Sequence, residues 1–158
     1  MANVTIEYVI LIPLLFTQVI AFPLVASAMT SNWENQQRDV ELQDAADHLA
    51  STIQQLYLTA SRDEILAGTI THASPVPTTV SSYRYTATGS LTNPSNPNST
   101  KILTVTLMLE EVGNIARAQA LLGPDVQWVE STLQSSSSSA SIVIQKFSNR
   151  TLVFSFGG

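Results

Sequence analysis

The stretch VTIEYVILIPLLFTQVIAFPLVASAM, Val4 to Met29, decides the fold that the sequence predicts. It holds one acid, Glu7, after which no formally charged residue occurs until Glu34. As a helix rising about 1.5 Å per residue, Tyr8 to Met29 is long enough to cross a hydrocarbon layer of about 30 Å. Because the run is apolar on all sides, such a helix must be surrounded by lipid or by other packed helices.

Two prolines interrupt this run. Pro13 and Pro23 each remove a backbone N–H and press on the preceding turn, so a kink or a locally unwound stretch is expected at one or both. A secretory signal peptide fits the run poorly, because no Lys or Arg precedes it and it is longer than the apolar core of such a signal.

From Asn32 the sequence continues the helix with a different pattern. Apolar residues recur at three- and four-residue spacings, which predicts an amphipathic helix. They are Leu42, Ala45, Ala46, Leu49, Ile53, Leu56 and Ala60. One helix from about Thr5 to Ala60 is the simplest interpretation. It would be on the order of 80 Å long and would need a partner along its whole length.

The remainder of the chain carries strand signals. Residues 101–110 alternate, with Leu103, Val105, Leu107 and Leu109 on one face and Ile102, Thr104, Thr106 and Met108 on the other. Other predicted strands are 81–88, 127–133, 141–147 and 150–156, the last two joined by a hairpin turn at Asn149-Arg150. Residues 113–122 are a candidate short helix, and the polar stretches 93–100 and 135–139 are expected to be exposed loops.

The predicted fold class is therefore α+β, with a long N-terminal hydrophobic helix followed by a small antiparallel β-sandwich-like domain. The helix takes residues 1–62, with a hydrophobic assembly or membrane part at about 4–30 and an amphipathic part at about 31–62. Residues 63–80 are a linker and 81–158 form the β domain. A fragment of about 63–158 is expected to be soluble and not to polymerise, because the apolar surface that drives assembly lies almost wholly before Ala60. If Leu49, Ile53 and Leu56 cover the core of the β domain, the fragment is expected to aggregate instead.

Charge and composition exclude several classes of function. The net charge of −5 and seven scattered basic residues argue against nucleic acid as a partner. The absence of cysteine excludes disulfides and thiolate metal sites. His48, His72 and the pair Glu110-Glu111 fit solvated surfaces better than a site. Without a phosphate loop, a nucleophile elbow or zinc spacing, neither catalysis nor a cofactor is expected.

Three asparagines lie in N-glycosylation patterns: Asn3, Asn98 and Asn149. Asn98, in a loop rich in Pro, Asn and Ser, is the best candidate. Asn3, beside the apolar run, is the poorest.

The N-terminal segment resembles the start of type IV pilins at Ile6-Glu7-Tyr8 followed by Pro13-Leu14-Leu15. Phe16 and Pro23, further along the same helix, are also candidate assembly residues, although a second proline departs from the pattern of that family. The resemblance covers about the first 60 residues. It implies that Glu7 pairs with the terminal amine of a neighbouring subunit and that a prepilin peptidase cuts a leader. If the mature chain begins at Asn3, Glu7 is its fifth residue, the usual spacing of that family.

This resemblance implies a structural homopolymer, inserted in the cytoplasmic membrane before a pilus assembly machinery builds it into an extracellular filament. A long helix followed by a Ser/Thr-rich, cysteine-free β domain with sequons resembles the arrangement of an archaeal pilin or archaellum subunit, although the β domain itself carries no motif of that family. The segment from Glu7 to Leu15 also resembles TadE-like pseudopilins. The alternative is a single-pass anchor with Glu7 at the lipid headgroups and a monomeric binding module outside.

Overall fold

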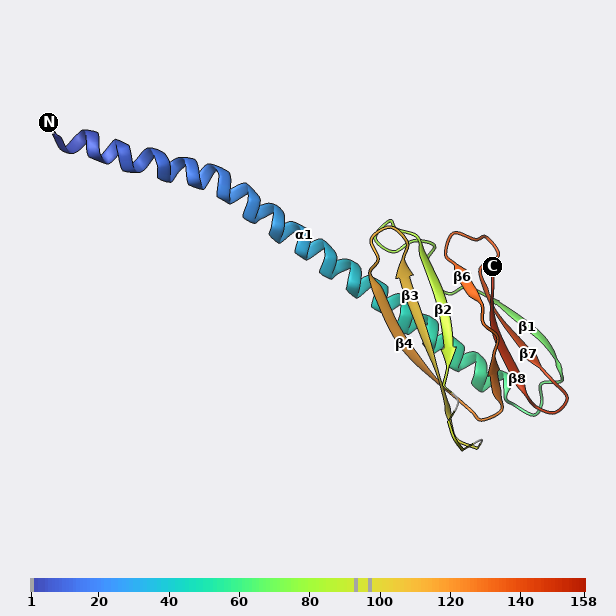
Figure 1. The fold of residues 1–158 in the computed structure, drawn as a ribbon. Helices are drawn as coiled ribbons and strands as arrows, with labels where there is room; N and C mark the ends of the chain where they lie inside the picture. The colour runs from blue at the N-terminus through green and yellow to red at the C-terminus, as the bar shows by residue number, and fades with distance from the viewer. Residues whose placement is uncertain (1, 93, 97) are drawn as a thin grey trace. The chain divides into compact units, whose positions relative to one another are not determined.

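The computed structural model describes residues 2–92, 94–96 and 98–158, with side chains described from Leu11 onward. One helix, α1 (Ala2–Ala60), precedes eight strands, which confirms the predicted α+β fold (Figure 1). The strands are β1 (Gly68–Ala73), β2 (Tyr85–Leu91), β3 (Lys101–Leu109), β4 (Ile115–Leu122), β5 (Val126–Trp128), β6 (Thr132–Gln134), β7 (Ser141–Lys146) and β8 (Leu152–Gly157). The chain divides into two compact units, 1–37 and 38–158.

The strands form two four-stranded sheets. One has the order β1-β7-β8-β5 and the other β4-β3-β2-β6. Six strand pairings are described, of which five are antiparallel as predicted. The sixth differs, because β5 runs parallel to β8, with Val126 opposite Leu152. The first sheet is therefore mixed, because the chain returns from β5 to β8 through β6 and β7 instead of through a tight hairpin.

The second half of α1 forms part of the core of the unit 38–158. Leu42, Ala46, Leu49 and Ile53 are completely buried, as the three- and four-residue spacing predicts. Figure 1 shows this half passing behind strands β2 to β4. Two hydrogen bonds fix it there: Gln43 Nε2 donates to the Arg117 carbonyl at 3.0 Å, and Asn114 Nδ2 to Asp39 Oδ1 at 2.6 Å.

This packing corrects two expectations. The amphipathic half of α1 finds its partner within its own chain, so it does not by itself require another subunit. A fragment of 63–158 would also lack one wall of its core, because the helix supplies the buried side chains that cover the sheets. The boundary of the self-contained unit lies at residue 38.

Strand β3 follows the predicted alternation, whereas β4 does not follow its predicted helix. The inward-facing residues of β3 are fully buried: Leu103, Val105, Leu107 and Leu109. Residues 115–122 form a strand, not a helix, and alternate between exposed and buried positions. Their buried positions include Ala116, Ala118 and Ala120, which belong to the hydrophobic core.

Strand β1 lies inside the segment predicted to be a linker. It pairs antiparallel with β7, Ile70 opposite Ile144, at the edge of its sheet. The hairpin between β7 and β8 is confirmed. Its turn holds Arg150 at a φ of 68°, a left-handed conformation that glycine would adopt at lower cost.

The serine stretch 135–139 also differs in part from the exposed loop that was predicted. Ser135 is buried, and its Oγ accepts a hydrogen bond from the Tyr85 backbone N–H at 2.9 Å. The Tyr85 hydroxyl in turn donates to the Pro77 carbonyl at 2.6 Å. Burial raises the pKa of Tyr85 to about 12. The pKa of Tyr85 thus exceeds the ordinary value of about 10, so the folded state favours the protonated hydroxyl. The contribution of this hydroxyl to the stability of the fold is therefore present at neutral pH and is lost as pH rises from about 10 through 12.

A buried lysine closes the C-terminal end of α1. Lys146 Nζ on β7 donates to the Ala60 carbonyl at 2.8 Å and to the Arg62 carbonyl at 2.6 Å. A helix ends with carbonyls that lack partners and carry partial negative charge, so a cation here satisfies both needs.

We expect Lys146→Met to lower the free energy of unfolding by about 2–3 kcal/mol, because hydrogen bonds from a charged donor contribute about 1.5–3 kcal/mol and the carbonyls would stay buried. Thermal and urea unfolding of the detergent-solubilised chain measures the loss. Arg150→Met is the matched control: it breaks only the exposed pair with Asp63 at 3.3 Å, worth less than about 1 kcal/mol. Equal losses in the two variants would contradict this role of Lys146.

Candidate assembly surface

The unit 1–37 exposes a continuous apolar surface over its described residues. Every large apolar side chain from Leu11 to Met29 is between 50% and 78% exposed. They are Leu11, Ile12, Leu14, Leu15, Phe16, Val19, Ile20, Phe22, Leu24, Val25 and Met29. Burying one such side chain gains about 1.5–3 kcal/mol, and patches this large mark surfaces that bind lipid or protein.

Two hydroxyls on or next to this surface are satisfied by the helix itself. Thr17 Oγ1 donates to the Pro13 carbonyl at 2.8 Å, and Thr30 Oγ1 to the Ala26 carbonyl at 3.0 Å. These bonds let the hydroxyls enter an apolar medium at little cost. Gln18 differs, because its amide has no hydrogen-bond partner among the residues that the structure describes.

Helix α1 continues through both Pro13 and Pro23, so of the two expected distortions, a kink or an unwound stretch, the unwound stretch is not found. Pro23 nevertheless has no N–H to donate to the Val19 carbonyl one turn earlier. A shallow groove lies at this point, lined by Gln18, Val19, Phe22 and Pro23 among others.

The predicted assembly residues fall into two groups. Pro13, Leu14, Leu15, Phe16 and Pro23 all lie on the exposed helix. The side chains of Asn3, Glu7 and Tyr8 lie outside the part of the chain that the structure describes. The pairing of Glu7 with a terminal amine therefore stays a prediction.

The two better glycosylation candidates lie at exposed positions. Asn98 is exposed in the loop before β3, and Asn149 in the turn between β7 and β8. Asn149 Oδ1 accepts a hydrogen bond from the Thr151 N–H at 3.1 Å. That bond uses the amide oxygen, whereas a sugar attaches to the amide nitrogen.

We expect the native protein to be glycosylated at Asn98, and at Asn149 as a second site, because an acceptor must be reachable on a loop or turn. Intact-mass measurement on protein from its native host checks this, with Asn98→Gln and Asn149→Gln as the variants that assign each mass increment. A mass equal to that of the bare polypeptide would refute it.

The two histidines and the glutamate pair lie on three different elements of the fold. His48 is exposed on α1, His72 is exposed on β1, and Glu110 and Glu111 occupy the turn after β3. Within residues 2–92, 94–96 and 98–158, no group of three His, Asp or Glu side chains lies together as metal ligands would. An open cleft between β2 and β5 was not predicted from the sequence, because the residues that line it come from segments far apart in the chain, 88–91 and 126–132.

Helix α1 is, among the described residues, the one helix long and apolar enough to cross a membrane by length and composition. No family model, curated protein or solved structure matches the chain. The architecture, a long apolar N-terminal helix followed by a β domain, is compatible with that of pilins.

Proposed function

We propose that this chain is a structural subunit of an extracellular helical filament of the type IV pilin kind. The apolar half of α1 bundles with its copies in the filament core, and the β domains face outside for adhesion or other surface interactions. The observation that carries the proposal is the exposed apolar surface from Leu11 to Met29, on a helix whose second half is already packed. The proposed function is structural and uses neither catalysis nor a cofactor.

The same surface serves two successive states. In the cytoplasmic membrane it contacts lipid, and in the filament it contacts other copies of itself, as the bundle replaces the bilayer. The amide of Gln18 favours the second state, because interhelical hydrogen bonds between polar side chains contribute about 0.6–2 kcal/mol in apolar surroundings. The proposed partners are therefore the membrane, a prepilin peptidase, the assembly machinery and further copies of the chain.

One observation favours a second candidate, a single-pass anchor that carries a monomeric binding module. Because residues 42–60 pack within their own chain, a helix longer than the bilayer is explained without a filament. A minor TadE-like pseudopilin would share the helix but be scarce at the cell surface.

Cross-linking distinguishes filament from anchor, since the chain has no native cysteine. Val19→Cys places a thiol on the apolar surface. A bifunctional maleimide with a long flexible arm, added to intact surface material, should give covalent dimers, because copies are packed side by side there and the arm spans the distance between their thiols. The same reagent, added after detergent separates the copies, should leave monomers. Monomers in both samples would contradict the filament proposal.

A further inference from the structure

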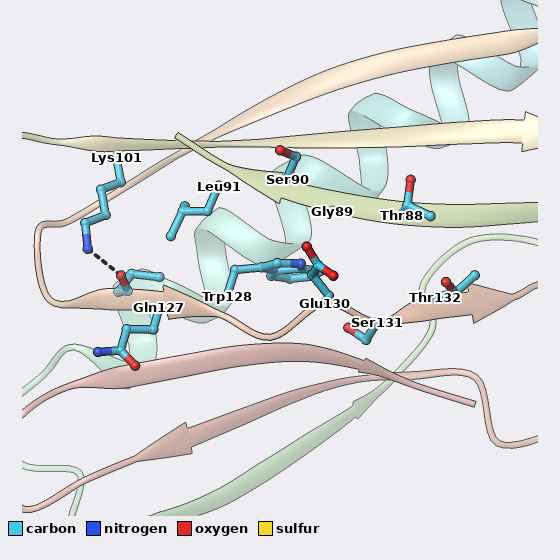
Figure 2. Close-up of a pocket in the computed structure, with 11 residues that line it drawn as sticks. Thr88, Gly89, Ser90, Leu91, Lys101, Gln127, Trp128, Glu130, Ser131 and Thr132 are labelled. Carbon is cyan, nitrogen blue, oxygen red and sulfur yellow. Dashed lines mark hydrogen bonds between the residues drawn. The ribbon is translucent and has the colours of Figure 1, made fainter. Parts of the chain in front are cut away.

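A cleft opens in the unit 38–158 between the end of β2 and strand β5 (Figure 2). Strand β6 pairs only with Thr86–Thr88, so the last residues of β2, Gly89–Leu91, are paired on one side alone within the described sheets. Strand β5 pairs with β8 alone among the described strands. The cleft between these two edges has a volume of about 760 Å³, within the range of small-molecule sites.

Trp128 forms an apolar platform in this cleft. Its indole lies directly on Gly89, where an added Cβ would stand 2.2 Å from Trp128 Cζ2, and it meets the Phe156 ring edge-on at 5.0 Å. The ring is therefore held in place while staying only half-buried. Its Nε1 is shielded from solvent and has no hydrogen-bond partner among the described residues. Burying an N–H without an acceptor lowers the stability of a protein by about 1–3 kcal/mol, so the unpaired Nε1 of Trp128 needs an explanation.

Polar side chains line the rest of the cleft. Lys101 Nζ donates to the Val126 carbonyl at 2.7 Å, the bond drawn in Figure 2, and an ammonium has two further donors. Gln127 and Glu130 are exposed at the rim, with threonine and serine hydroxyls beside them. The single lysine and single glutamate among the lining residues cancel in charge, so the cleft favours neither anions nor cations.

We propose that this cleft binds a neutral saccharide. An apolar ring face suits the C–H face of a sugar, and the surrounding amide, carboxylate, ammonium and hydroxyl groups suit its hydroxyls. A sugar hydroxyl would also give the Trp128 N–H the acceptor it lacks, once a rim side chain moves aside. The inference goes beyond the filament proposal and does not depend on it, because the whole cleft lies within residues 38–158.

The saccharide has two possible sources. A second cleft, of about 400 Å³, shares Lys101 and Gln127 with the first and reaches Asn98, the best glycosylation candidate. The ligand is therefore either a glycan from the surroundings or the glycan carried by the chain's own Asn98. The chemistry of the cleft is the same in both cases.

Fluorescence of Trp128 tests the proposal in the full chain. The chain has two tryptophans, so Trp33→Phe leaves Trp128 as the only source of tryptophan fluorescence. The chain is kept in a detergent without a sugar headgroup and titrated with maltopentaose, cellopentaose, mannopentaose and chitopentaose to about 10 mM, a range that detects weak binding. We expect a saturable change in Trp128 fluorescence with at least one of these neutral oligosaccharides. We expect no change in this fluorescence with inorganic phosphate or with a pentamer of galacturonic acid.

Variants place the binding in the cleft. Gln127→Ala and Glu130→Ala should each weaken it at least ~5-fold, the effect of losing one hydrogen bond. Gln145→Ala and Glu111→Ala, which change exposed residues outside the cleft, should leave the affinity for the saccharide unchanged.

The source of the saccharide is tested by comparing protein from its native host with the Asn98→Gln variant from the same host. If only the variant binds the added saccharide, the glycan on Asn98 is the natural occupant of the cleft. If both bind it equally, the natural occupant is a glycan from the surroundings. Absence of saturable binding in both forms, preference for the acidic probes, or equal affinity in rim and control variants would overturn the proposal.

Discussion

A fragment that begins at residue 38 is expected to fold as a soluble monomer, whereas one that begins at residue 63 is expected to aggregate. The difference is the second half of α1, which supplies Leu42, Leu49 and Ile53 to the core, each with no exposed surface. Burial of each contributes about 1.5–3 kcal/mol, so their joint loss approaches the whole stability of about 5–15 kcal/mol that domains possess.

Removing the helix also destabilises the strands of the remaining fragment. Leu103, Leu107 and the other inner residues of β3 would lose their cover, and Lys146 would lose the carbonyl of Ala60. Light scattering after gel filtration and thermal unfolding by circular dichroism measure both fragments. A fragment of 31–158 is the control and should behave as 38–158 does. Cooperative unfolding of a monomeric 63–158 fragment would show that the helix is dispensable for the core.

The second large effect is expected from Glu7→Gln. If Glu7 pairs with the terminal amine of a neighbouring subunit, the amide leaves that ammonium poorly compensated, and breaking a buried ion pair costs about 3–5 kcal/mol. This cost recurs at every subunit, so filaments should be largely lost. Insertion of the single chain into the membrane should persist, because an amide is no harder to place in an apolar run than a carboxylate.

The measured quantity for this variant is the ratio of filament protein to membrane-pool protein in cells. Asp44→Asn is the matched control, since it makes the same acid-to-amide change at an exposed position of α1. A headgroup anchor predicts no effect of Glu7→Gln, because an exposed carboxylate contributes little. A ratio equal to that of the control would therefore remove the assembly role of Glu7.

The elements with strong hydrophobic periodicity were predictable from sequence. The apolar spacing from Leu42 to Ile53 and the strict alternation from Leu103 to Leu109 each match one face that the structure buries. In both segments the local pattern and the tertiary packing favour the same structure.

Elsewhere tertiary packing decided against the local signal. Residues 115–122 are rich in Ala, Arg, Gln and Leu, which favour a helix, yet they form β4 because they pair with β3 along their whole length and bury every second side chain in the core. Ile70 is the one residue of strand β1 that is partly buried, and the other five are exposed. The sequence of this edge strand therefore lacks the hydrophobic alternation of a strand and was interpreted as a linker. Ser135 resembles its serine neighbours in sequence and differs only through its bond to Tyr85, 50 residues away.

The candidate assembly surface was predictable because it depends on composition alone, a helix without charge from Tyr8 to Met29. The cleft was not, since Gly89 and Trp128 become neighbours only when β2 and β5 are brought together in the fold. A lone tryptophan and a strand glycine carry no signal of that contact in the sequence.

Electron microscopy of material sheared from the cell surface tests the filament proposal most directly, when mass spectrometry identifies the protein in the filaments that are seen. The proposal predicts thin helical filaments in which this chain is the abundant subunit, absent from cells that lack it and restored by the unaltered chain. Finding the chain only in the membrane fraction as a monomer, with no filament containing it, would contradict the proposal.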